Sequence, residues 1–254
     1  MRILCTNDDG VHGPGLAVLE KIARELTEDV WVVAPEYDQS GVSHSLSLND
    51  PMRLREVAPK HYAVKGTPTD CVIMAVRRLM FDNPPDLVLS GVNRGQNVAE
   101  DVIYSGTVAG AVEATIIGIP AIALSQAYEH RQRDSVPWHC AEHHGASVIR
   151  RILELGIPEG GCVNVNFPGC SPQDVAGTRV VTQGRRSQDI LQIDERQDGR
   201  SIPYYWIGFE RQREEPENGS DLWAIANRYI AVTPLRIDMT DHSTLTQYAQ
   251  GFAE

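Results

Sequence analysis

The N-terminal stretch Met1-Arg2-Ile3-Leu4-Cys5-Thr6-Asn7-Asp8-Asp9-Gly10 is the part of the sequence that decides the fold. Residues 3–5 form a continuous apolar run, which is typical of a central strand of a parallel sheet that is buried on both faces. Asp8 and Asp9 follow where this strand ends and the chain turns at Gly10. Open α/β sheets bind ligands at the carboxyl ends of their strands. Two neighbouring carboxylates there need a cation, or one of them must hold a proton.

The sequence Asn-Asp-Asp-Gly is also favourable for a plain turn, so the acidic pair alone does not decide between a turn and a cation site. The residues that follow predict a βαβ unit, with an amphipathic helix between Leu16 and Leu26 and a second strand at residues 30–34. Strand, helix and strand in this order form a right-handed unit of a parallel sheet.

Further elements follow the same pattern along the chain. Strands are expected at residues 86–90, 120–125 and 162–167, and helices at residues 67–80, 108–117 and 138–155. The first of these helices begins with Thr67-Pro68-Thr69-Asp70, in which Thr67 and Asp70 have the spacing of a capping box. We therefore expect an α/β fold with a mostly parallel sheet.

The character of the sequence changes after Gly169. Short β-like pieces at residues 179–183, 190–193, 203–208 and 228–233 are separated by charged loops, and residues 245–252 predict a terminal helix. We therefore divide the chain into a catalytic core, residues 1–168, and a β-rich C-terminal extension, residues 169–254. A set of short elements of this kind is suited to exchange between subunits, so the extension is expected to serve oligomerisation.

Composition bounds the class of protein. A length of 254 residues suits one large α/β domain, alone or with a smaller appendage. The net charge of −11 argues against a nucleic-acid polymer or an anionic membrane as a partner. The five cysteines are scattered and form no close pair, as in reduced proteins. No signal peptide or apolar run of transmembrane length is evident, so a cytoplasmic location is expected.

Two further polar residues follow predicted strands. Ser40 lies in the polar loop after the second strand, and Asn93 lies after the strand at residues 86–90. The carboxyl ends of parallel strands meet at one edge, so we expect both residues near Asp8 and Asp9. Carboxylate, hydroxyl and amide oxygens without clustered His or Cys suit a hard cation such as Mg²⁺, Mn²⁺ or Ca²⁺.

The segment Ser105-Gly106-Thr107 is a candidate anion site because it stands at the start of a predicted helix. Free backbone N–H groups and the helix dipole favour negative charge there, and glycine permits close approach of a phosphate. The alternative is that Ser105 is only the N-cap of the helix. The chain has no Walker A motif, which argues against a nucleoside triphosphatase.

Four motifs together resemble the SurE survival-protein family, and the likeness extends over nearly the whole chain. They are Asn-Asp-Asp-Gly at 7–10, Ser-Gly-Val-Ser-His-Ser at 40–45, Ser-Gly-Val-Asn-Arg-Gly-Gln-Asn at 90–97 and Asp-Val-Ile-Tyr-Ser-Gly-Thr-Val at 101–108. The resemblance implies a Rossmann-like three-layer core and a metal-dependent phosphomonoesterase. Its expected substrates are nucleoside 5′- and 3′-monophosphates and, in some members, short polyphosphate. Members assemble as homodimers or homotetramers through exchanged C-terminal segments.

The resemblance also implies roles for individual residues. One divalent ion, Mg²⁺ or Mn²⁺, would be bound by Asp8, Asp9, Ser40 and Asn93. The phosphate pocket would be lined by Asn97, Ser105, Gly106 and Thr107. Asp8, Asn97 and Ser105 would act in catalysis. The chain departs from the usual family pattern at Ala99 and Ala114, where glycine is common.

Two other classes of protein also use acidic residues after a first strand. A Mg²⁺-binding receiver-like signalling module would need an acceptor Asp after its third strand and a Lys after its fifth. Here the later strand ends offer Asn93 and Ser125, and no Lys follows Lys65. A haloacid-dehalogenase-like phosphatase would need Asp-x-Asp, whereas Asp8 and Asp9 are adjacent.

Overall fold

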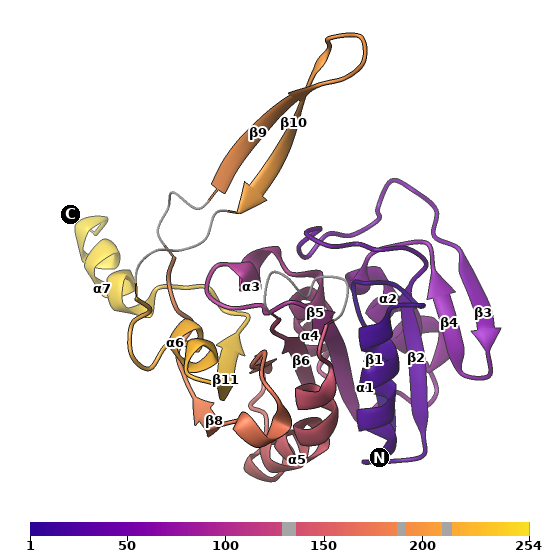
Figure 1. Ribbon diagram of the computed structural model, residues 1–254. Helices are drawn as coiled ribbons and strands as arrows, with labels where there is room; N and C mark the ends of the chain where they lie inside the picture. The colour runs from indigo at the N-terminus through magenta and orange to yellow at the C-terminus, as the bar shows by residue number, and fades with distance from the viewer. Residues whose placement is uncertain (129–135, 187–190, 210–214, 254) are drawn as a thin grey trace.

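The computed structural model describes residues 1–128, 136–186, 191–209 and 215–253, and a nine-stranded sheet forms its centre (Figure 1). In sheet order, the strands are β3 (Leu54–Ala58), β4 (His61–Val64), β2 (Val30–Pro35), β1 (Ile3–Thr6), β5 (Leu87–Arg94), β6 (Ala121–Gln126), β7 (Gly161–Phe167), β11 (Tyr229–Arg236) and β8 (Gly177–Val180). Antiparallel pairing occurs between β3 and β4 and between β7 and β11, and the other neighbours are parallel. The predicted mostly parallel sheet is confirmed.

Strand β1 lies inside the sheet, between β2 and β5. Ile3 and Cys5 belong to the apolar cluster on one face of the sheet, and Leu4 belongs to the cluster on the other. All three side chains are fully buried, which explains why the strand is apolar without alternation. The chain passes from β1 to β2 on one side and returns to β5 on the other, so the strand order reverses at β1. Such a switch point is where open α/β sheets bind ligands.

Helices cover both faces of the sheet, as the prediction of an α/β fold requires (Figure 1). Helices α1 (Pro14–Arg24) and α5 (His139–Leu155) pack on one face, and α2 (Pro68–Met74) and α4 (Gly106–Ile117) pack on the other. The predicted capping box of Thr67 and Asp70 is present at the start of α2, which continues as a π-helical turn, Ala75–Leu79. Two short helices, α3 (Asp101–Tyr104) and α6 (Asp221–Ala226), lie near the carboxyl edge and beside β11, respectively.

Strand β5 is longer than the sequence predicts. We expected a strand to end at Ser90, but the ladder shifts register after Ser90 and resumes with Asn93 opposite Ser125. Gly91 makes this possible, because a Cβ at that position would lie 2.2 Å from the carbonyl oxygen of Leu124. Asn93 therefore stands on the end of β5 and not in a loop.

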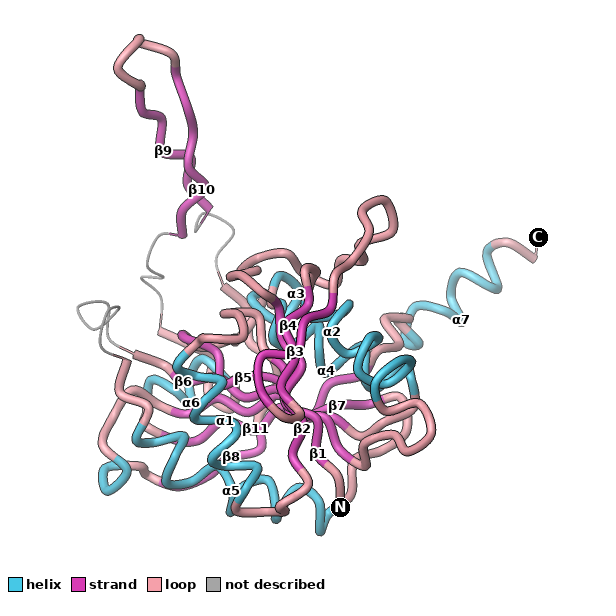
Figure 2. The backbone as a smooth tube through the Cα atoms, turned by 90° about the vertical axis from the view of Figure 1, so that its right-hand side faces the viewer, coloured by secondary structure: helices cyan, strands magenta, loops and turns pink. Residues whose placement is uncertain are grey.

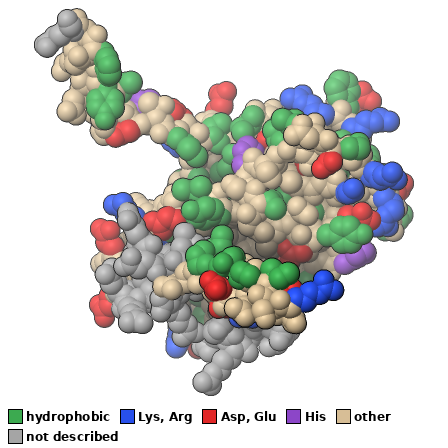
Figure 3. Space-filling view, turned by 90° about the horizontal axis from the view of Figure 1, so that it is seen from above, with side chains coloured by type: hydrophobic (Ala, Val, Ile, Leu, Met, Phe, Trp, Pro, Cys, Tyr) green, Lys and Arg blue, Asp and Glu red, His purple; other side chains and the backbone are tan. Residues whose placement is uncertain are grey.

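The C-terminal part of the chain contributes both to the sheet and to two projections. Strands β11 and β8 extend the main sheet beyond β7, whereas β9 (Leu191–Gln197) and β10 (Pro203–Phe209) form a separate antiparallel hairpin that extends away from the body (Figures 1 and 2). Helix α7 (His242–Gly251) projects separately, and hydrophobic side chains lie on it in the space-filling view (Figure 3). Ile190, the first residue of one expected strand, lies outside the described residues. No helix among the described residues is long and apolar enough to cross a membrane.

Candidate functional site

The carboxylate of Asp8 meets the N-terminus of α4. Asp8 follows β1 and is only 3 % exposed, and its Oδ1 accepts a hydrogen bond of 2.5 Å from Thr107 Oγ1, 99 positions away in the chain. Gly106 allows this approach, because a Cβ there would lie 2.8 Å from Asp8 Cβ. Ser105 is the N-cap of α4, since its Oγ accepts from the Val108 N–H at 3.1 Å. The N-cap interpretation is thus confirmed, and the same helix terminus lies against a buried acid.

Burial disfavours the charge on both acidic side chains. It raises the pKa of Asp8 to about 6; the Thr107 hydrogen bond acts in the opposite direction, and the charge of Asp9 raises the pKa further. Burial also raises the pKa of Asp9. Two groups of Arg94 lower it: the backbone N–H, which donates to Asp9 Oδ2 at 3.2 Å, and the guanidinium charge. A cation bound between two such carboxylates would favour their ionised forms.

The turn that carries the acidic pair is held by its neighbours. Asn7 is fully buried and donates from Nδ2 to the Gly10 carbonyl at 3.0 Å. The Gln39 N–H donates to the Asp8 carbonyl at 2.8 Å, which joins the loop after β2 to the end of β1. Asn7 is not among the residues predicted for the site; its only signal in the sequence is an amide directly before the acidic pair, where it can hydrogen-bond within a turn.

Asn93 lies near the end of β5 and Ser40 lies in the loop after β2, and both hydrogen-bond to other partners than the acidic pair. Ser40 follows Gln39, is exposed, and donates from Oγ to Asp38 Oδ1 at 2.6 Å. Asn93 donates from Nδ2 to the Gly95 carbonyl at 2.8 Å. Because the amide nitrogen makes that bond, the amide oxygen is directed away from it, and oxygen is the atom that a hard cation binds.

Asn97 is fixed by polar groups of the central strands. Its N–H donates to Asn166 Oδ1 at 2.8 Å, and its carbonyl accepts from Asn164 Nδ2 at 2.8 Å and from Asn166 Nδ2 at 3.0 Å. Its side chain donates from Nδ2 to Ser125 Oγ at 2.9 Å. Neither Asn164 nor Asn166 is among the residues predicted for the site. Their signal is the alternating Val-Asn-Val-Asn at 163–166, since buried asparagines require partners.

Replacement of Asn166 by alanine is expected to destabilise the protein by about 1–3 kcal/mol, because the N–H of buried Asn97 then loses its acceptor. Urea unfolding of the purified variant measures this change. Asn227→Ala is the matched control, since Asn227 makes an exposed hydrogen bond to Trp223 O of 2.9 Å. Equal losses of stability in the two variants would contradict the supporting role of Asn166.

The donor set fits a hard divalent cation. It consists of two carboxylates, a hydroxyl and an amide, all oxygen donors, at the carboxyl edge of adjacent strands. Within the described parts of the chain, no three His, Cys, Asp or Glu side chains gather as a metal-binding group. The only cationic group that contacts either acid among these residues is Arg94, whose Nε lies 4.0 Å from Asp9 Oδ1. The buried charge of Asp8 is therefore suited to an added cation.

Comparison with known proteins agrees with the fold and the motifs. The family described as survival protein SurE matches residues 3–189. A protein from Methylorubrum populi named 5′-nucleotidase SurE is 66 % identical over 252 residues, which is 99 % of either chain. A protein of the same name from Methylobacterium nodulans is 67 % identical over 252 residues, covering 99 % of this chain and 100 % of that protein.

A crystal structure of the SurE protein from Aquifex aeolicus has the same architecture. It superimposes with a TM-score of 0.85 at 36 % sequence identity and covers 98 % of this chain and 100 % of that chain. The family motifs, the order of the strands and these similarities all agree. The chain belongs to the SurE survival-protein family.

Proposed function

We propose that this protein is a divalent-metal-dependent phosphomonoesterase that hydrolyses nucleoside 5′-monophosphates to nucleoside and phosphate. Nucleoside 3′-monophosphates and short polyphosphate are proposed as further substrates. One observation carries the proposal: the buried Asp8 carboxylate is joined by Thr107 and Gly106 to the N-terminus of α4. In this proposal Asp8 binds the cation and the helix terminus binds the phosphate, and the contact between them supports phosphate chemistry. The relatives named 5′-nucleotidase SurE support the choice of substrate.

The proposed cation ligands are Asp8, Asp9, Ser40 and Asn93, with Mg²⁺ or Mn²⁺ as the ion. When bound, such an ion neutralises phosphate charge and polarises the phosphorus atom.

The remaining site residues act on the phosphate itself. The first N–H groups of a helix have no partner within the helix, so that of Gly106 can bind a phosphate oxygen. The Thr107 N–H is directed at the Asp8 carboxylate, so Thr107 links the acid to the phosphate pocket. Ser105 Oγ accepts from Val108, which leaves its hydroxyl hydrogen to donate to a phosphate oxygen. Together with Asn97, these donors would stabilise charge that develops in the transition state.

We further propose a homodimer or homotetramer assembled through the C-terminal extension. The β9–β10 hairpin and α7 carry exposed apolar side chains, among them Trp206 at 58 %, Ile207 at 70 % and Tyr248 at 63 % exposure. A two-stranded hairpin is marginally stable alone, so a covering partner is expected. The five free cysteines, four of them buried, support a cytoplasmic location.

The proposal is tested by measuring phosphate release from nucleoside 5′-monophosphates, nucleoside 3′-monophosphates and polyphosphate, with Mg²⁺, with Mn²⁺ and with EDTA. We expect turnover of the 5′-monophosphates that EDTA removes and an excess of metal restores. Undiminished turnover in EDTA would refute the metal requirement. A preparation that is folded and loaded with metal but releases no phosphate from any nucleoside monophosphate would refute the nucleotidase assignment.

A further inference from the structure

The loop between Asn97 and Ser105 contains a residue in a backbone conformation that its side chain disfavours. Ala99 is completely buried and has a φ of +53°. In this left-handed region the Cβ crowds the backbone, so residues other than glycine adopt it only where the surroundings enforce it. Because Asn97 and Ser105 stand at the two ends of this loop, its path bears on the proposed phosphate site.

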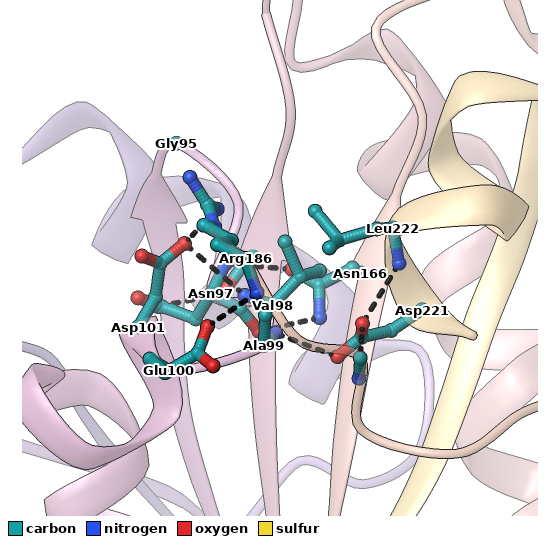
Figure 4. A network of polar contacts seen from close by, with 12 residues as sticks. Gly95, Asn97, Val98, Ala99, Glu100, Asp101, Asn166, Arg186, Asp221 and Leu222 are labelled. Carbon is teal, nitrogen blue, oxygen red and sulfur yellow. Dashed lines mark hydrogen bonds and ion pairs between the residues drawn. The ribbon is translucent and has the colours of Figure 1, made fainter. Parts of the chain in front are cut away.

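A carboxylate from the C-terminal part of the chain binds the backbone of Ala99. Asp221 is fully buried at the start of α6, and its carboxylate accepts from three backbone N–H groups: Ala99 at 2.9 Å, Gly184 at 2.9 Å and Leu222 at 2.7 Å (Figure 4). Hydrogen bonds to an ionised acceptor are stronger than neutral ones. Gln183 Nε2 donates to the Ala99 carbonyl at 2.9 Å, so both backbone polar groups of Ala99 are bound by this part of the chain.

A second contact joins the same two segments. The Arg186 N–H donates to Glu100 Oε2 at 3.0 Å, and the Arg186 guanidinium forms an ion pair with Asp101 (Figure 4). Strand β7 binds the Asn97 end of the loop, whereas residues 183–186 and Asp221 bind its middle. Helix α3 begins at Asp101, directly after the middle of the loop, and Ser105 follows the last residue of α3.

We propose that Asp221 is a positioning residue for the phosphate site, which holds Ala99 in the left-handed conformation and thereby sets the path from Asn97 to Ser105. The proposal rests on the proposed phosphatase function for its activity readout. Residue 99 provides a direct test, since glycine adopts a positive φ without steric cost. With glycine at this position the left-handed conformation costs less free energy, so the path of the loop depends less on the hydrogen bond to Asp221.

The test compares Asp221→Asn, Ala99→Gly and the double variant with the unmodified full-length protein, each saturated with Mg²⁺. Asparagine offers one acceptor oxygen where the carboxylate offers two, so Asp221→Asn weakens the hold on Ala99. We expect kcat to fall on the order of tenfold to a hundredfold with little change in KM. Ala99→Gly alone is expected to stay within about twofold of the unmodified protein, and the double variant to recover most of the loss.

A merely structural role for Asp221 predicts a different result. Ala99→Gly also relieves the strain of the left-handed conformation and so raises Tm, and kcat is therefore compared at a temperature where every variant is fully folded. Equal losses of kcat in Asp221→Asn and in the double variant would overturn the proposal, as would full activity in Asp221→Asn. Ser220→Ala is the matched control. Ser220 Oγ caps α6 by accepting from the Trp223 N–H at 3.2 Å, and its removal leaves the contacts of Ala99 in place. It should lower Tm and leave kcat unchanged below the transition.

Two measurements keep the test decisive. If Asp221→Asn does not fold, Gln183→Ala replaces it: a loss of kcat that Ala99→Gly relieves supports the proposal, and unchanged kcat overturns it. Amide hydrogen exchange of residues 95–105 tests the tether without any substrate. Faster exchange in Asp221→Asn, slowed again by Ala99→Gly, supports the tether even if the unmodified protein releases no phosphate, and unchanged exchange refutes it.

Discussion

Asp8→Asn is expected to lower kcat for nucleoside monophosphates on the order of 10³-fold while leaving the fold intact. Asp8 is the buried carboxylate at the switch point of the sheet and the acceptor of the Thr107 hydroxyl. Asparagine preserves the shape and the acceptor oxygen but removes the charge that a divalent cation requires. Phosphate release at saturating Mg²⁺ or Mn²⁺ measures the effect, and circular dichroism measures the fold.

The same variant is expected to be more stable than the unmodified protein when metal is absent. The pKa of Asp8 is raised by burial from 3.8 to about 6, so the folded state favours the protonated acid. As pH rises from about 4 to 6, Asp8 gives up its proton in the unfolded chain but keeps it in the folded protein. The free energy of unfolding therefore falls by up to about 3 kcal/mol over this range. The asparagine side chain of the variant does not ionise, so its stability lacks this dependence on pH. In EDTA, Asp8→Asn should therefore gain stability at pH 8 and little at pH 4.

Asp82→Asn is the control for both measurements, because Asp82 is exposed in the turn before β5, at the opposite edge of the sheet. It should match the unmodified protein in activity and in the pH dependence of stability. Substantial turnover by Asp8→Asn at saturating metal would remove Asp8 from the proposed site. An equal gain of stability at pH 4 and pH 8 would show that the buried charge is not its cause.

Gly106→Ala is expected to lower kcat on the order of 10²-fold, because a methyl group at this position displaces the Asp8 side chain. The added Cβ would lie 2.8 Å from Asp8 Cβ, 3.1 Å from Asp8 Oδ2 and 3.2 Å from Pro68 Cγ. The nearest neighbour, Asp8 Cβ, is attached directly to the backbone and cannot swing away, so the N-terminus of α4 and the acid must move apart. The contact between the proposed cation and anion sites is then lost. Phosphate release from a nucleoside 5′-monophosphate measures the fall in kcat.

Gly110→Ala is the matched control, one turn further along α4. Its added Cβ would lie 2.9 Å from Ser90 Oγ and 3.2 Å from Thr6 Cγ2, so it is similarly crowded but faces other residues. We expect it to lower Tm while kcat stays close to that of the unmodified protein below the transition. A Gly106→Ala variant with normal kcat, or a Gly110→Ala variant that loses as much activity as Gly106→Ala, would contradict the importance of the Asp8–Gly106 contact.

Much of the fold could be predicted because its determinants are local. The apolar run of β1 predicts a strand buried on both faces, and the structure confirms it. Thr67 and Asp70 mark the start of α2, and Ser105 marks the start of α4. Each signal depends on residues within one turn or one strand, where backbone hydrogen bonding and side-chain period follow from the sequence itself. The start of β8 and the length of β5 were predicted less well, because strand ends depend on the neighbouring strand.

The candidate site was predicted as a set of strand ends, and this too has a local basis. Alternating strands and helices predict a parallel sheet, and a parallel sheet brings its carboxyl ends to one edge. Asp8, Asp9, Ser40 and Asn93 could therefore be assigned to that edge from the sequence. The start of a predicted helix indicated Ser105, Gly106 and Thr107, whereas the role of Asn97 came from the resemblance to the SurE family alone.

The sequence by itself thus determined the βαβ order, the sheet edge that carries the acidic pair, and the family. Only the tertiary structure decided which polar groups touch: Thr107 with Asp8, Asn166 with Asn97, and Asp221 with Ala99. These partners are 99, 69 and 122 positions apart. Their contact depends on strand order, on the close approach that Gly106 and Gly91 permit, and on the packing of the C-terminal segment against the loop. No local pattern encodes such contacts, because they form only when distant elements pack together.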